Sequence, residues 1–154
     1  MGLYFEDFEL ERRFTSRGRT ITETDVVLFA GISGDYVELH TNEEYAKQTA
    51  YGRRIVQGAL VLSIAIGLTT RMNLTDDTVV AFWGIDDLRF LHPTSIGDTV
   101  QISKRVVERH EIDPTKGMVV FETRVTTQRA ETVAVFRDKL VIKRREAVAQ
   151  AGGA

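Results

Sequence analysis

Residues 57–72 read QGALVLSIAIGLTTRM, from Gln57 to Met72, and this stretch decides the fold that the sequence predicts. It is apolar on nearly every helical face until Thr69, a pattern typical of a helix that is buried on most sides. At 1.5 Å per residue, such a helix spans roughly 24 Å. A curved antiparallel sheet can cover one apolar helix, so we predict an α+β fold with a sheet wrapped around residues 57–72.

The segments that follow the helix supply the strands of that sheet. Residues 79–91 are strand-like and aromatic, and alternating apolar residues continue at 100–106, 119–125 and 133–143. Turn residues such as Asp113-Pro114 separate these stretches. One sheet layer leaves a sheet edge and part of the helix uncovered, so we expect a homodimer or a higher homo-oligomer.

The segments before the helix carry two helix-capping signals. Thr22 with Asp25 predicts a short helix that ends near Gly31 to Gly34, and residues 41–44 open another helix over about 43–48. Residues 35–39 are predicted as loop. Residues 3–17 are predicted as an entry segment and a first strand.

Length and composition predict one globular domain over residues 1–154. The chain has 154 residues, of which 43% are hydrophobic and 27% charged. We expect the core to cover about residues 5–143 and the polar tail, 144–154, to be flexible.

A formal net charge of −2 gives no reason to expect nucleic acid or a membrane surface as a partner. The apolar segment 58–68 is too short to span a bilayer, which takes roughly 20 residues.

The chain contains no cysteine, which excludes disulfides, thiolate metal sites and cysteine nucleophiles. This composition fits a reducing compartment, so we expect a cytoplasmic protein. The histidines His40, His92 and His110 lie far apart in the sequence and lack the spacing of a helical metal site. We therefore expect neither a metal nor another cofactor.

Asp35, His40 and the backbone of Gly58 are the predicted catalytic groups. Asp35 and His40 flank a predicted loop before a helix, where both side chains can converge on one small molecule. The free N–H groups of that helix disfavour an added positive charge, which suits His40 as a base or a water ligand. Gly58 begins the long helix, where its N–H lacks a helical partner and a carbonyl oxygen can approach closely. One such oxyanion-hole donor contributes roughly 3 kcal/mol to transition-state stabilisation.

These residues belong to a longer pattern that resembles a known family. The pattern consists of Ser33-Gly34-Asp35, His40, Glu44-Tyr45-Ala46, Gly52, Ile55-Val56-Gln57-Gly58, Phe90-Leu91-His92-Pro93 and Gly97-Asp98. In this combination and spacing it resembles the MaoC-like dehydratases, a family that includes the (R)-specific enoyl-CoA hydratases and has the hot-dog fold. The resemblance covers about residues 5–143.

The resemblance implies a homodimer with an acyl-CoA tunnel near the subunit interface. It further implies that Asp35 and His40 hold a catalytic water while the Gly58 N–H binds the thioester oxygen. Water would then add to C3 of a trans-2-enoyl thioester and a proton would reach C2. The sequence leaves open which of the two side chains gives or takes each proton, and whether the carrier is CoA or an acyl carrier protein.

The sequence also departs from the family pattern at two places. Val37-Glu38 stands where the family usually has Asn-Pro, and Gln57 stands where it often has histidine. Glu38 could contact a polar acyl group or face water. The remaining candidates for substrate contact are Val56 and Gln57 beside the helix start, and Arg53 and Arg54 as partners of CoA phosphates.

Two other functions remain open at this point. A hot-dog thioesterase commonly has an acidic residue on or near its central helix, and the absence of Asp and Glu from residues 58–72 counts against it. A non-catalytic acyl-CoA-binding subunit is the second alternative. Four further expectations concern single side chains: Ser63 and Thr69 bond within the helix, His92 is structural, His110 is exposed, and Phe82 and Trp83 lie in the core or an interface.

Overall fold

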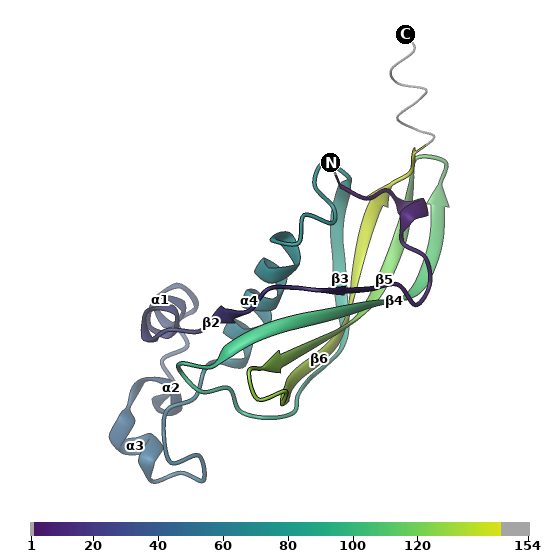
Figure 1. Cartoon of the computed structure of the whole chain (residues 1–154). Helices are drawn as coiled ribbons and strands as arrows, with labels where there is room; N and C mark the ends of the chain where they lie inside the picture. The colour runs from purple at the N-terminus through teal and green to yellow at the C-terminus, as the bar shows by residue number, and fades with distance from the viewer. Residues whose placement is uncertain (1, 146–154) are drawn as a thin grey trace.

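The computed structural model describes residues 2–145, in which one helix lies against one face of a six-stranded antiparallel sheet (Figure 1). The helix is α4 (Gly58–Thr70). The strands are β1 (Arg13–Thr15), β2 (Arg19–Thr20), β3 (Val79–Phe90), β4 (Thr99–Asp113), β5 (Lys116–Thr127) and β6 (Thr132–Lys143). Their order is β1-β4-β5-β6-β3, and β2 also pairs with β4. The predicted sheet around one apolar helix is confirmed.

The side of α4 that faces the sheet forms the main core. Its buried residues are Leu60, Val61, Ile64, Ala65 and Leu68, which pack with apolar residues of β4, β5 and β6 such as Ile102, Val125 and Phe136. A second cluster, which includes Phe8, Val106 and Phe121, joins the 3-10 helix η1 (Phe5–Asp7) to the sheet. Alternating strand positions thus supply the apolar surface that the α4 sequence requires.

The opposite side of α4 is open, as expected where one sheet layer covers a helix, so the prediction that most sides of the helix are buried is wrong for the single chain. Ser63 and Gly67 are exposed, and Ile66 keeps 38% of its surface accessible. The reason is that a single sheet layer covers only one side of a helix. The Ser63 and Thr69 hydroxyls donate to the carbonyls of Ala59 and Ala65, as expected, at 2.8 and 3.2 Å.

Three short helices, α1 (Glu23–Ser33), α2 (Glu38–Thr41) and α3 (Glu43–Lys47), lie together beyond one end of the sheet (Figure 1). The predicted capping box is present in α1, and this helix ends at Gly34, whose φ of +78° suits glycine. The prediction of a loop up to Leu39 is wrong in part. The backbone N–H groups of His40 and Asn42 donate to the carbonyls of Val37 and Glu38, so His40 lies on a helical turn.

Strand β3 forms one edge of the sheet and is exposed along most of its length. Phe82 and Phe90 are about half exposed, and Trp83 keeps 66% of its surface accessible. Trp83 is therefore not a core residue of the single chain. Leu28 and Ile32 of α1 are also exposed apolar side chains, at 61% and 86%.

The first two residues of the predicted flexible tail, Arg144 and Arg145, are held by ion pairs. Arg144 forms ion pairs with Glu6 and Glu111, and Arg145 forms one with Asp7. These contacts fix the chain beyond β6, and the rest of that prediction, residues 146–154, lies outside the described residues. Within residues 2–145, no helix has both the length and the apolar run needed to cross a bilayer.

Candidate active site

His40 and Gly58 line one hollow of about 290 Å³ between α2, the start of α4 and the end of β3. The structure thus brings together two of the three predicted catalytic groups, although they come from different helices. Eleven residues line the hollow: His40, Tyr51, Ile55, Val56, Gly58, Val61, Phe90, Leu91, His92, Pro93 and Thr94.

The His40 ring is oriented by a backbone carbonyl. Its Nδ1 atom lies 2.7 Å from the carbonyl oxygen of Ile55. A carbonyl oxygen only accepts hydrogen bonds, so Nδ1 carries the proton and, in the uncharged ring, Nε2 offers a lone pair. The segment that supplies this carbonyl is itself fixed, because Ile55 forms an isolated bridge with Ser95 and the Val56 N–H donates to Thr94.

Gly58 is the first residue of α4, and its N–H has no partner within the helix. The positive end of the helix dipole adds to this donor. A Cβ atom on residue 58 would lie 3.0 Å from the Phe90 ring, which is too close for ordinary packing. Glycine therefore lets the Phe90 ring lie against the start of α4, beside an N–H that has no helical partner and could serve as an oxyanion donor.

Asp35 lies outside this hollow in the described chain. It follows the Gly34 turn, is half buried, and its backbone N–H donates to the Ser33 hydroxyl at 3.1 Å. Its catalytic role remains a prediction.

Of the five predicted substrate contacts, Val56 alone lines the hollow. The Gln57 side chain is fully buried and donates from Nε2 to the Val26 carbonyl, while Glu38 is exposed and accepts from Asn42. Arg53 is exposed. The Arg54 guanidinium pairs with Glu23 and Glu43, and these contacts raise its pKa and occupy the donors that a CoA phosphate would use.

Sequence reasoning overlooked most of the wall that faces His40. Phe90, Leu91, His92 and Pro93 line the hollow as one run. The sequence signal that could have identified them as site residues was that all four belong to the family pattern. His92 has the expected structural contact as well, because its Nδ1 lies 2.9 Å from the Thr132 carbonyl oxygen. His110 is exposed, as expected, beside Glu108.

A second, largely apolar hollow of about 390 Å³ lies along the C-terminal half of α4, between Ile66 and Phe82 of β3. Asp138 contributes to its wall. The Asp138 carboxylate accepts from Lys104 and from Thr123, each at 2.5 Å, and Lys104 is 1% exposed. Burial lowers the pKa of Lys104, and the Asp138 charge offsets part of that effect.

The arrangement defines a class of site before any relative is considered. A sheet wrapped around one helix presents an unpaired N–H at the helix start, and an oriented imidazole shares its hollow, which suits polarisation of a carbonyl group and movement of a proton. Within residues 2–145, no three His, Asp or Glu side chains gather in a way that could hold a metal ion.

Comparison with known proteins agrees with this class. Residues 7–130 match the family model of the MaoC like domain, so the chain belongs to the MaoC-like family. It is 37% identical over 124 residues to the (R)-specific enoyl-CoA hydratase of Rhodospirillum rubrum, covering 80% of this chain and 81% of that protein. It is 34% identical over 111 residues to Protein MaoC of Klebsiella aerogenes, covering 70% of this chain but only 32% of that protein.

Solved structures identify the fold. A monoamine oxidase regulatory protein from Archaeoglobus superposes with a TM-score of 0.88 at 40% identity, covering 93% of this chain and 95% of that one. A Mycobacterium tuberculosis protein with a double hot-dog fold gives a TM-score of 0.83 at 21% identity, covering 93% and 44% of the two chains. The predicted hot-dog fold is confirmed.

Proposed function

We propose that this protein is a hydro-lyase that adds water across the C2=C3 bond of an enoyl-CoA thioester and dehydrates 3-hydroxyacyl-CoA in reverse. The observation that carries the proposal is the shared hollow of His40, oriented through Nδ1, and Gly58, at the start of α4. Family membership supports it, as do relatives named (R)-specific enoyl-CoA hydratase and 3-hydroxybutyryl-CoA dehydratase.

In this mechanism the Gly58 N–H binds the thioester oxygen. Negative charge grows on that oxygen as water attacks C3, and the α4 dipole stabilises it. The oxygen of water bonds to C3, one of its protons ends on C2, and the other remains in the new hydroxyl group. His40 Nε2 and the Asp35 carboxylate hold the water and carry the proton between them.

The acyl group is proposed to extend from the hollow at Gly58 along α4 and β3 toward the second, apolar hollow. Phe90 borders Gly58, while Phe82 and Ile66 border the apolar hollow further along both elements. Asp76, Asp77 and Asp138 line that second hollow. Asp138 is paired with Lys104, but the charges of Asp76 and Asp77 disfavour a carboxylated acyl end, so we propose uncharged acyl groups as substrates.

A second copy of the chain is proposed to cover the β3 edge and the apolar side chains of α1. An exposed edge strand with aromatic residues is a ready surface for pairing with another chain. This contact would enclose the acyl site and bring further side chains to Asp35.

The absence of cysteine fits a reducing compartment, and we propose the cytoplasm as the location of the protein.

The test follows loss of the conjugated enoyl absorbance of crotonyl-CoA and longer trans-2-enoyl-CoA esters. We expect Asp35→Asn and His40→Ala each to lower turnover by about 10²- to 10⁴-fold, the usual contribution of an acid or base. His110→Ala is the matched control and should retain wild-type turnover, because His110 is exposed and far along β4.

Three results would contradict the proposal. His40→Ala with wild-type turnover would refute the site. Release of free thiol without loss of the double bond would indicate a thioesterase. Tight acyl-CoA binding with no turnover across the panel would indicate a binding subunit.

A further inference from the structure

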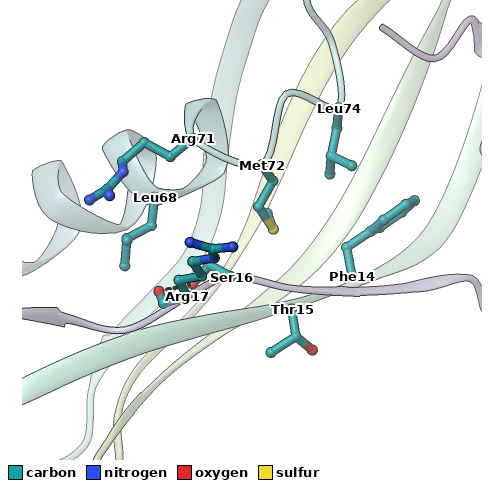
Figure 2. A pocket seen from close by; sticks show the side chains of 8 residues that line it. All are labelled: Phe14, Thr15, Ser16, Arg17, Leu68, Arg71, Met72 and Leu74. Atoms are coloured by element: carbon teal, nitrogen blue, oxygen red, sulfur yellow. Dashed lines mark hydrogen bonds between the residues drawn. The ribbon is translucent and has the colours of Figure 1, made fainter.

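A separate hollow of about 400 Å³ lies between the β1 region and the C-terminal end of α4 (Figure 2). It is on the side of α4 that is opposite strand β3. It is lined by Phe14, Thr15, Ser16, Arg17, Leu68, Arg71, Met72 and Leu74. Leu68 lies roughly 15 Å along the helix axis from Gly58, at 1.5 Å per residue. The hollow is therefore distinct from the candidate active site.

Its lining is divided into an apolar end and a basic end. Figure 2 shows the side chains of Phe14, Met72 and Leu74 pointing toward a common space, with the Arg17 guanidinium on the Leu68 side. An adjoining hollow of about 290 Å³ shares Leu68 and Arg71 and adds Arg19. Arg71 lines both hollows, Arg17 lines the first and Arg19 the second, and neither lining includes an acidic residue.

The arginines at this basic end have unused donors. Within residues 2–145, neither Arg17 nor Arg71 has a carboxylate within ion-pair distance, although most basic side chains of the described chain do have one. Arg19 donates through Nη2 to Asp25 at 2.5 Å, but its Nη1 is buried without a partner. A buried, unpaired donor costs free energy that a bound acceptor would recover.

The end of α4 explains only part of this pattern. Arg71 caps the helix C-terminus, where a cation offsets the partial negative charge of the last carbonyls. Arg17 comes from the segment after β1, and Arg19 from β2, so neither is accounted for by that effect. Basic side chains from three elements thus line two adjoining hollows, and they can supply the donors that recognition of an anion requires.

We propose that this pair of hollows binds a small amphipathic anion, a carboxylate or phosphate head on an apolar body of several carbons. Arg17, Arg19 and Arg71 bind the head, because the arginine fork matches the geometry of both oxyacids. Phe14, Met72 and Leu74 cover the apolar body. The site is separate from the proposed catalytic hollow, so its occupancy does not depend on enoyl-CoA turnover.

The test is titration of the full chain by calorimetry with octanoate, octyl phosphate, butanoate, inorganic phosphate and octanol. We expect saturable binding of octanoate or octyl phosphate, and the tighter of the two identifies the head group. Butanoate, phosphate and octanol should bind about tenfold more weakly or not at all, because each lacks part of the ligand. Equal binding of octanol would refute the arginine site, and equal binding of phosphate or butanoate would refute the apolar end.

Variants locate the site. The double substitution Arg17→Gln with Arg71→Gln should weaken binding by about tenfold or more. Arg13→Gln is the matched control, since Arg13 is an exposed residue of β1 that lacks a carboxylate partner among residues 2–145 and does not line the hollow. Wild-type affinity in the double variant, or an equal loss in Arg13→Gln, would overturn the proposal.

A labelled wild-type chain provides a test that needs no variant. With ¹³C-methyl methionine, the Met72 resonance should shift on addition of octanoate or octyl phosphate. Met118 lies on β5 and outside both hollows, so its resonance should stay in place. A shift at Met118 without one at Met72 would refute the assigned location.

Discussion

The Nδ1 atom of His40 lies 2.7 Å from the carbonyl oxygen of Ile55, and this contact sets which ring nitrogen faces the candidate active site. The relationship joins α2 to the segment that leads into α4. Gly58 follows Ile55 by three residues. The contact therefore links the orientation of the imidazole to the position of the Gly58 N–H.

The first prediction concerns the tautomer of His40. We expect the uncharged ring to carry its proton on Nδ1, because only a donor can satisfy the Ile55 carbonyl. Long-range ¹H–¹⁵N correlation spectra of the ¹⁵N-labelled chain distinguish the two tautomers. A spectrum in which Nε2 carries the proton would mean that the ring does not present a lone pair to the water.

The second prediction concerns Gly58 and Phe90. Gly58→Ala should lower stability by about 1–3 kcal/mol and reduce kcat/KM, because the new methyl group would lie 3.0 Å from the Phe90 ring. Phe90→Ala in the same chain should remove the clash. Urea unfolding of both single variants and the double variant measures the coupling. Strictly additive free energies would show that the two residues do not compete for space.

The third prediction concerns the buried Lys104–Asp138 pair. Lys104→Met should lower the free energy of unfolding by about 3–5 kcal/mol, because it leaves a buried carboxylate without its cation. Lys104→Met with Asp138→Leu should be less destabilised than Lys104→Met alone, since no buried charge remains. Urea unfolding at neutral pH compares the single and the double variant. A double variant that is less stable than Lys104→Met alone would contradict this account.

The fourth prediction concerns pH and Asp98. Burial raises the pKa of Asp98, but hydrogen bonds from Arg129, Gln128 and the Ser95 N–H outweigh it and hold the pKa below 3.8. A lowered carboxyl pKa stabilises the fold above the unfolded value and loses that effect as pH falls through the folded value. Asp98→Asn should therefore cost about 1–3 kcal/mol at pH 7 and less at pH about 3. An equal cost at both pH values would contradict the assignment.

The fifth prediction concerns the β3 edge. Trp83→Lys should convert the proposed dimer to monomer and lower turnover, because it places a charge on an exposed edge strand. Sedimentation measures the mass, and Leu10→Lys is a control at another exposed apolar residue. Trp83 is the single tryptophan of the chain, so its emission should shift to longer wavelength on dissociation. A wild-type chain that sediments as a monomer at working concentration would refute the second-copy proposal.

Much of the fold could be predicted because its signals are local. The apolar run at 57–72, the alternation in the later strands and the Thr22–Asp25 capping box each act within a few residues. The short helix at His40 was missed because its single turn depends on hydrogen bonds to Val37 and Glu38 and has no periodic pattern. That one sheet layer leaves part of α4 uncovered was expected, but the apolar run alone overstated how many of its sides are buried, because composition does not say how many layers cover a helix.

The sequence by itself determined one long apolar helix, the strands that cover it, and the residue types of a MaoC-like site. Only the tertiary structure decided which of those residues meet: it placed His40 beside Gly58, occupied Arg54 with Glu23 and Glu43, and buried Gln57 against Val26. The physical reason is the separation along the chain of the residues that interact. Capping, turns and periodicity are settled between neighbours in the chain, whereas ion pairs and hollows arise between segments that only the packed sheet and helix bring together.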